Sequence, residues 1–336
     1  MPVGREGSLR LLHMLAGALL LLHQPTAACA QTVWNMTTEY PQGAVSGLGV
    51  TSFAQHVARL GAGKLVIQPS FDAAKGVRSA DMLTALAEGR VEAGDAFAGS
   101  LEAEDAIFAL PSLPFLVTSI ADARRLAELA RPYLAAALQK RGARLLYLTP
   151  WPPSGIWSKA PVKTPSDLSG LSIRTYDRIS REVFARAGAR ATFISFAETL
   201  PRLADGSINA VLSSGDGDAG RKLWQFLPYF TDITYSLPLS VASVNQAAYD
   251  ALAPELRDAV DRAGRQTETE IWFALSSRLR QNQQRMREAG VTIDANPSPA
   301  LVAALQSGAA AAQQDWCARS GPACQQVLGV FKSGKP

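Results

Sequence analysis

Histidine and cysteine are scarce in this chain of 336 residues, which contains three of each. His13 and His23 stand in the first 30 residues, so only His56 remains in the rest of the chain. A zinc site usually needs several His or Cys ligands, and a Ser-His-Asp triad needs a histidine beside its nucleophile. His56 lies in an amphipathic helical pattern, where a surface or packing role is expected. We therefore expect no catalytic residue, no metal and no cofactor.

Long apolar runs and blocks of one charge sign are also missing. After residue 30 no stretch approaches the roughly 20 apolar residues of a membrane-spanning helix. Lysine and arginine number 33 against 29 acidic residues, and they are spread along the chain. This weak positive charge does not indicate nucleic-acid binding. Hydrophobic residues make up 47% of the chain, which is enough for a sizeable core and excludes a disordered protein.

The first 30 residues have the layout of a secretory signal. Two arginines precede an apolar run at Leu11–Leu22, and a series of small residues ends at Ala30. The run is short for a membrane anchor, so cleavage before Gln31 is the favoured interpretation. A lipid anchor at Cys29 is a weaker alternative, because the usual preceding leucine is absent. We expect a protein exported to the periplasm of a Gram-negative cell.

Cysteine use agrees with export. Beyond residue 30 only Cys317 and Cys324 remain, with six residues between them. In an oxidising compartment such a pair is expected to form one structural disulfide. A redox-active pair would more often have two residues between its cysteines.

Glycine-rich and acidic segments give only weak motifs. Gly61–Lys64 lacks the residues and spacing of a phosphate-binding loop. Gly215–Asp218 resembles the start of a calcium loop, but Leu227 stands where a glutamate is needed. We expect turns at both places. The carboxylates near Glu102 and Asp216 leave a cofactor-free enzyme open as an alternative.

Strand and helix patterns alternate along the chain, which indicates an α/β fold with largely parallel strand pairing. After a break at Pro150–Pro153, a second block of such patterns begins. Apolar residues at helical spacing then fill 254–289, which would be roughly 54 Å long as one helix. Such a helix could bridge two lobes, and two helices with a break are the alternative. The expected strands are 32–36, 64–70, 92–97, 143–148, 171–176, 192–196 and 210–213, and the expected helices are 45–60, 79–88, 121–141, 164–168 and 180–187, with a further helix ending near Gly206.

Several short segments occur in an order that covers nearly the whole chain after residue 30. The most specific is Ser158–Arg174, which reads SKAPVKTPSDLSGLSIR. The others are GKLVI at 63–67, MLTALAEGRVE at 82–92, LPSLPF at 110–115, GARAT at 188–192, LADGSINAV at 203–211 and LAPEL at 252–256. Together these segments resemble the substrate-binding subunits of tripartite ATP-independent periplasmic (TRAP) transporters, the DctP-like family.

The resemblance implies a two-lobed periplasmic binding protein fold with hinge strands and a long spanning helix. The first lobe would comprise 31–149 and about 237–262, and the second 150–236 and about 290–330. The spanning helix would be about 254–289. A ligand would bind in the cleft between the lobes and be delivered to the small and large membrane subunits. The expected state is a monomer. A periplasmic sensor module would have the same pocket, so it stays an alternative.

The resemblance also implies a carboxylate-binding residue. By motif match, the family's conserved arginine is Arg174, whose planar guanidinium can hold a carboxylate through two parallel hydrogen bonds. Ser213 stands where many relatives have asparagine, and Ser154 where some acidic-sugar binders have a second arginine. A second carboxylate on the ligand would therefore lack a partner.

Aromatic residues lie near the segments that face the cleft in this family. Their flat apolar rings could stack on a ligand, and ordinary core positions are the alternative for each. We predict a small monocarboxylate with an apolar or aromatic body, such as an aryl or branched 2-oxo or 2-hydroxy acid. The rings concerned are Phe97, Trp151, Trp157 and Phe196.

Overall fold

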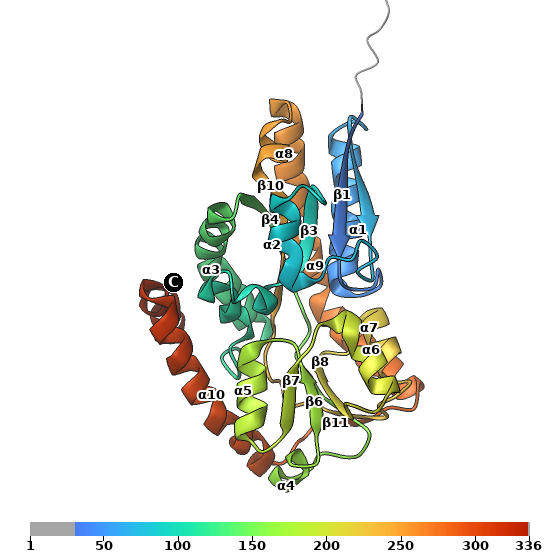
Figure 1. Ribbon diagram of the computed structural model, residues 1–336, viewed down its shortest axis with the longest axis vertical. Coiled ribbons are helices and arrows are strands. Elements are labelled where there is room, and N and C mark those ends of the chain that lie inside the picture. Colours follow the sequence, from blue (N-terminus) through green and yellow to red (C-terminus); the bar gives the residue numbers. More distant parts are fainter. Residues whose placement is uncertain (1–30, 335–336) are drawn as a thin grey trace, which may run out of the picture. The chain divides into compact units, whose positions relative to one another are not determined.

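A computed structural model of the protein describes residues 31–334, in which two separate β-sheets form the centres of two lobes (Figure 1). The expected signal segment, residues 1–30, lies outside the described residues. Within 31–334, none of the helices combines the length and the apolar character needed to cross a membrane.

The first lobe is built on a five-stranded sheet in the order β2-β1-β3-β10-β4. Its central strands are buried on both faces: every residue of β3 and all but the last of β10 are buried, including the polar Asp95 and Ser240. The strands are β1 (Thr32–Thr38), β2 (Leu65–Ser70), β3 (Ala93–Phe97), β4 (Ala143–Pro150) and β10 (Leu239–Asn245). The helices of this lobe are α1 (Val45–Leu60), η1 (Ser79–Asp81), α2 (Met82–Ala87), η2 (Ala98–Leu101), η3 (Ala106–Ser112), α3 (Ile120–Lys140) and α8 (Gln246–Asp250).

The second lobe is built on a six-stranded sheet in the order β11-β9-β5-β8-β6-β7. The strands are β5 (Gly155–Ser158), β6 (Ser172–Thr175), β7 (Arg190–Phe193), β8 (Ala210–Ser213), β9 (Tyr229–Thr231) and β11 (Thr292–Asp294). The helices are α4 (Pro165–Leu168), α5 (Arg178–Arg186), α6 (Phe196–Ala204) and α7 (Gly217–Leu223).

Strand pairing is mixed, which corrects the expectation of largely parallel sheets. β1 runs parallel to β2 and β3, but β10 is antiparallel to both β3 and β4. In the second sheet β5 is antiparallel to β8 and β9. The reason is topological, because β5 carries the chain into the second lobe and β10 brings it back. Neither strand belongs to a strand–helix–strand repeat, which is the unit that produces parallel pairing.

Helix α9 (Pro254–Glu288) is unbroken, so the single long helix is confirmed and the two-helix alternative is wrong. Val260, near its beginning, packs in the first-lobe core with Phe53 and Tyr147. Met286, near its end, packs in the second-lobe core with Trp157. At 35 residues and about 1.5 Å per residue the helix is roughly 52 Å long, so one element belongs to both lobes.

The C-terminal elements also contact both lobes. Helix α10 (Pro299–Ser320) packs against α5 and α4 near its start and against η3 further along (Figure 1). The chain then forms η4 (Cys324–Gly329) and α11 (Val330–Ser333), which pack on α3. Arg125 of α3 donates to the carbonyl oxygens of Val330 and Phe331 at 3.1 and 3.0 Å.

Candidate ligand-binding site

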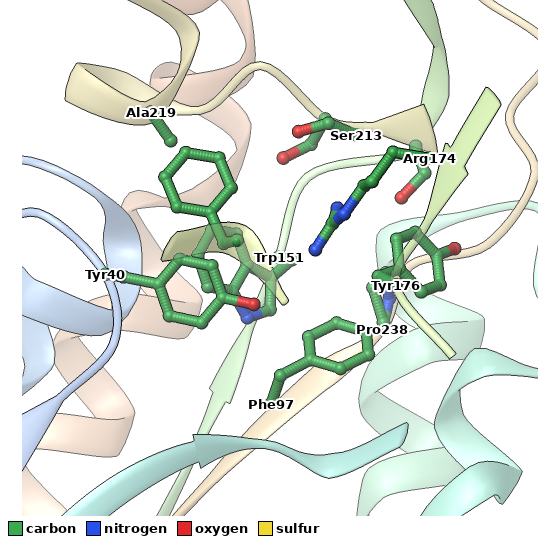
Figure 2. A pocket seen from close by; sticks show the side chains of 11 residues that line it. Tyr40, Phe97, Trp151, Arg174, Tyr176, Ser213, Ala219 and Pro238 are labelled. Carbon is green, nitrogen blue, oxygen red and sulfur yellow. The ribbon is translucent and has the colours of Figure 1, made fainter. Parts of the chain in front are cut away.

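A small cavity lies between the lobes, where the carboxyl ends of several strands meet. Tyr40 follows β1, Phe97 ends β3 and Trp151 follows β4, while Arg174 and Tyr176 come from the end of β6 (Figure 2). The free space in the cavity is about 30 Å³. Strand ends are the usual place for ligands in α/β sheets. The remaining lining residues are Ser154, Phe196, Ser213, Ser214, Ala219 and Pro238.

Arg174 is fixed from behind by backbone carbonyl groups. Its side chain is buried, with 3% of the residue exposed. Nε donates to the carbonyl oxygen of Ile194 at 2.8 Å, and Nη1 donates to that of Leu212 at 3.3 Å. Burial lowers the pKa of Arg174, against the opposing effect of Tyr40 and Glu39. The guanidinium remains a cation, and its remaining donors face the cavity beside Tyr40 (Figure 2).

Aromatic rings form two walls of the cavity. Tyr40 lies 4.6 Å from the Trp151 ring and 5.4 Å from the Phe196 ring, measured between centroids. On the other side Phe97 lies 4.9 Å from Tyr176. Each of these side chains is almost fully buried. A ligand here would contact flat apolar surfaces on both sides.

The two tyrosines bring hydroxyl groups to the site. Burial raises the pKa of both Tyr40 and Tyr176, so both phenols are neutral at ordinary pH. The Tyr176 hydroxyl lies 2.8 Å from Ser236 Oγ. With Ser154 and Ser213, these groups can donate or accept hydrogen bonds without adding charge.

A buried carboxyl group lies behind the aromatic wall. Trp151 Nε1 donates to Ser240 Oγ at 2.9 Å, and Ser240 lies close enough to Asp95 to influence the pKa of its carboxyl group. The Ser46 hydroxyl donates to Asp95, which is fully buried. Burial raises the pKa of Asp95 to about 7. Among residues 31–334 no group of three or more His, Cys, Asp or Glu side chains is placed to hold a metal ion.

The structure brings six of the seven sequence-predicted ligand residues into the cavity and places one elsewhere. Trp157 is fully buried in the core of the second lobe, 5.2 Å from the Phe230 ring. The backbone at Gly215 lies against its indole. Its side chain therefore packs away from the cavity. The six residues that line the cavity are Phe97, Trp151, Ser154, Arg174, Phe196 and Ser213.

Sequence reasoning missed Tyr40 and Tyr176. Tyr176 stands two residues after Arg174, and strand alternation places such a pair on the same side of the chain. Tyr40 comes just after β1, where a strand end approaches the cleft. Both signals were available in the sequence, although only the fold shows that the two strand ends meet.

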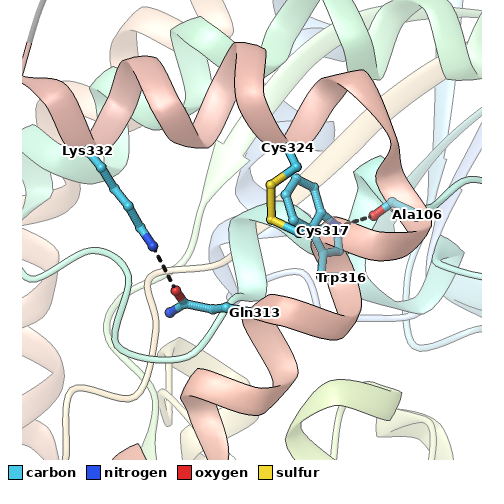
Figure 3. Close-up of a disulfide and its surroundings, with 6 residues drawn as sticks. All are labelled: Ala106, Gln313, Trp316, Cys317, Cys324 and Lys332. Atoms are coloured by element: carbon cyan, nitrogen blue, oxygen red, sulfur yellow. Dashed lines mark hydrogen bonds between the residues drawn. A yellow bond between two sulfur atoms is a disulfide. The ribbon is translucent and has the colours of Figure 1, made fainter.

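The predicted disulfide between Cys317 and Cys324 is present (Figure 3). It joins the end of α10 to the start of η4. Beside it, Trp316 Nε1 donates to the carbonyl oxygen of Ala106 at 2.6 Å, and Lys332 Nζ donates to Gln313 Oε1 at 3.2 Å. The disulfide therefore holds the bend in the chain where the C-terminal segment packs onto the first lobe.

The family model for bacterial extracellular solute-binding protein, family 7, matches residues 36–315. The chain belongs to this family. This membership confirms the DctP-like resemblance and the two-lobed solute-binding fold. The family consists of transport receptors located outside the cytoplasmic membrane.

Three solved structures illustrate the similarity. DctP7 from Bordetella pertussis, a solute receptor binding pyroglutamic acid, is 30% identical, with 90% of this chain and 99% of that chain covered and a TM-score of 0.85. DctP6 from the same organism, also binding pyroglutamic acid, is 27% identical, with 90% and 100% covered and a TM-score of 0.84. A marine metagenome TRAP solute-binding protein specific for pyroglutamate is 25% identical, with 90% and 99% covered and a TM-score of 0.84.

Proposed function

We propose that this solute-binding protein captures a compact monocarboxylate around Arg174, with pyroglutamate as the best-supported ligand. The observation that carries the proposal is one buried guanidinium, fixed by two backbone carbonyls, in a cavity closed by aromatic rings. Three similar receptors at 25–30% identity bind pyroglutamate or pyroglutamic acid, which supports the choice.

Charge matching favours a single carboxylate. Arg174 is the one ionisable cation among the residues that line this cavity. An unpaired charge in a closed, poorly solvated site is strongly unfavourable, so a second carboxylate on the ligand would lack compensation. Ser154 and Ser213 offer hydroxyl groups only. These features disfavour dicarboxylates and acidic sugars that need a second cation.

The size of the cavity favours a small ring over an aryl acid. Free space of about 30 Å³ is enough for only a few water molecules, so ligand entry requires some rearrangement of side chains or lobes. A five-membered lactam requires less rearrangement than a phenyl ring with a side chain. Its N–H and carbonyl group can bond to hydroxyls such as those of Tyr40 and Ser213, while its methylene groups contact the aromatic walls.

The family supplies the rest of the proposal. The mature protein would begin near Gln31, reside in the periplasm of a Gram-negative cell and deliver its ligand to the small and large TRAP membrane subunits. It would act by binding and release, without turnover. A sensor module with the same pocket would differ only in its partner.

Isothermal titration calorimetry of the purified protein from residue 31 onward tests this proposal. The panel contains L-pyroglutamate, D-pyroglutamate, L-proline, phenylpyruvate, a branched 2-oxo acid and succinate. We expect tight binding of a pyroglutamate enantiomer, weaker binding of the aryl and branched acids, and no binding of succinate. Tight binding of succinate alone would contradict the monocarboxylate assignment. Preference for an aryl or branched acid would keep the Arg174 site and replace pyroglutamate as the ligand.

A further inference from the structure

Two helices, α1 of the first lobe and α6 of the second, lack a capping side chain of their own. Helix α1 follows Ala44, which has no polar group, and no acidic residue stands in its first turn. Helix α6 follows Ser195, whose side chain makes no capping bond, and Glu198 in its first turn pairs with Arg78. The first backbone N–H groups of a helix need acceptors, and its positive end favours an anion. Each helix therefore needs an acceptor from elsewhere.

Glu39 of the first lobe supplies the acceptor for α6 of the second. Glu39 stands directly after β1, and its side chain is buried, with 3% of the residue exposed. Oε2 accepts from the backbone N–H of Ser79 in the first lobe at 2.8 Å. Oε1 accepts from the N–H of Ala197, in the first turn of α6, at 3.0 Å. One carboxylate thus joins the two lobes next to Tyr40 and Phe196, whose rings line the cavity.

Asp216 of the second lobe supplies the acceptor for α1 of the first. Its Oδ2 accepts from the N–H of Val45 at 2.6 Å. Arg278 and Asn282 of α9 donate to the same carboxylate at 2.6–2.7 Å, which fixes it in place. The Asp216 carboxylate, in the segment that resembled a calcium loop, therefore already accepts hydrogen bonds from Val45, Arg278 and Asn282. Its role is to hold the two lobes together.

Two glycines permit this close approach. A methyl group at Gly217 would collide with the backbone oxygen of Gly43, and one at Gly43 would collide with the Asp218 carboxylate. Instead, the Gly43 N–H donates to Asp218 Oδ2 at 3.0 Å, and Arg278 donates to the Gly43 oxygen at 2.6 Å. The lobes meet here through backbone, so even a small side chain would hold them apart.

We infer that Glu39 and Asp216 form a reciprocal latch, in which a carboxylate from each lobe caps a helix of the other lobe only while the cleft is closed. When the lobes part, the N–H groups of Val45 and Ala197 lose these carboxylate acceptors and form hydrogen bonds with water instead. The latch residues are positioning residues, because none of them lines the cavity. The inference rests on the proposed function only in taking the cleft to open and close around a ligand.

Chemical trapping of the closed state tests the latch without any ligand. Arg78 and Glu198 pair across the cleft at 3.1 Å, so Arg78→Cys with Glu198→Cys provides a reporter for a short bis-maleimide crosslinker. In the protein from residue 31 onward, the two native cysteines, Cys317 and Cys324, are joined to each other and do not compete. In this background we expect Glu39→Gln to slow crosslinking about tenfold, because the amide places a donor against a backbone donor. Asp216→Asn should act similarly.

Matched variants separate the latch from a general loss of stability. Asp167→Asn removes a carboxylate that accepts from Lys163 and Thr164 within one lobe, so it should leave the crosslinking rate unchanged. Gly43→Ala keeps every carboxylate and should slow crosslinking by obstructing closure. Thermal midpoints establish that each variant is folded. Wild-type crosslinking rates in folded Glu39→Gln and Gly43→Ala proteins would overturn the inference.

Ligand release gives an independent second readout. We expect L-pyroglutamate to dissociate about tenfold faster from Glu39→Gln than from wild type in stopped-flow experiments, with Asp167→Asn unchanged. If the wild-type protein binds no pyroglutamate, the ligand proposal fails while the crosslinking rates still decide the latch. If wild type binds it and Glu39→Gln releases it at the wild-type rate, the latch fails while the ligand proposal stands.

Discussion

The rings of Tyr40 and Phe196 stack across the cleft, with centroids 5.4 Å apart and 30° between their planes. One residue follows the first strand of the first lobe and the other opens helix α6 of the second. Their contact exists only when the lobes are together. It encloses the Arg174 guanidinium, which lies 6.0 Å from the Phe196 ring. In the proposed closure, the step that brings the lobes together therefore also completes the site.

Replacement of Arg174 should abolish ligand binding. Arg174→Ala removes the only cation in the cavity lining. Arg174→Lys replaces the planar guanidinium by a single ammonium group, which cannot bond to the Ile194 carbonyl oxygen and a ligand carboxylate at the same time. We expect at least about 100-fold weaker binding for both, in line with the loss of a buried charge-assisted pair. Calorimetry with L-pyroglutamate measures this. Affinity within a few-fold of wild type would contradict the assignment of Arg174.

Tyr40 should contribute through both its ring and its hydroxyl. Tyr40→Phe keeps the contacts with Trp151 and Phe196 and removes only the group beside Arg174. We expect about tenfold weaker binding, the size of one hydrogen bond in a buried site. Tyr40→Ala should cost more, since it also removes the stacking. Equal affinities for the two variants would show that the hydroxyl, and not the ring, contributes all of the Tyr40 effect.

The same substitution should have different effects at Trp151 and Trp157, on ligand affinity at the first and on stability at the second. Trp151→Phe alters the cavity wall and removes the bond to Ser240, so it should weaken ligand binding. Trp157→Phe alters only the second-lobe core, so it should lower the thermal midpoint and leave the affinity of the folded protein unchanged. Calorimetry and thermal unfolding on both variants check this. A large loss of affinity in Trp157→Phe would restore its predicted place in the site.

Asp95 should make the protein less stable as pH rises. Burial raises its pKa from 3.8 to about 7, so between about pH 4 and pH 7 the folded protein holds a proton that the unfolded chain has released. Its contribution is therefore present in full below about pH 4 and is lost as pH rises through about 7. The effect is on the order of a few kcal/mol.

Urea unfolding across this pH range measures the effect, with Asp95→Asn as the comparison. The variant cannot ionise at this position, so its stability should depend much less on pH. Some slope should remain, because burial also raises the pKa of Asp177, to about 6. Identical slopes for wild type and variant would show that Asp95 does not titrate in this window.

Removal of the disulfide should destabilise the protein and spare the site. Cys317 and Cys324 are seven positions apart, so the closed loop is short and the expected cost is about 2 kcal/mol. Thermal unfolding of Cys317→Ser with Cys324→Ser should show a midpoint a few degrees lower. Calorimetry should show unchanged affinity, because neither cysteine lines the cavity. A parallel loss of affinity would mean that the C-terminal segment influences the cleft.

Local chemistry made much of the fold predictable. Helix α1 runs from Val45 to Leu60, as its spacing predicted, because an amphipathic pattern ends at a glycine pair. The short helix α4 forms where Thr164 and Asp167 cap each other. By contrast, α10 is rich in small apolar residues on all sides, so its sequence has no polar face to reveal a helical period.

The sequence predicted site residues well where they belong to a recognisable strand motif. It predicted them less well where their position depends on contact between the lobes. Arg174 ends a recognisable strand. Trp151 and Trp157 stand only six residues apart. Pro152 and Pro153 interrupt the strand pattern between them, so strand alternation does not predict which ring faces the cleft. The antiparallel β10 and the partners of Glu39 depend on contacts between distant segments, which no local pattern encodes.

Within residues 31–334 the polypeptide passes between the lobes four times, through the β4–β5 and β9–β10 connections and along α9 and α10. The described chain therefore both begins and finishes on the first lobe. Trp316 and Phe331 cover surfaces beside Ala106 and α3 that were made some two hundred residues earlier. As the chain is synthesised, the second lobe can therefore be completed before α11 is available to cover the first lobe.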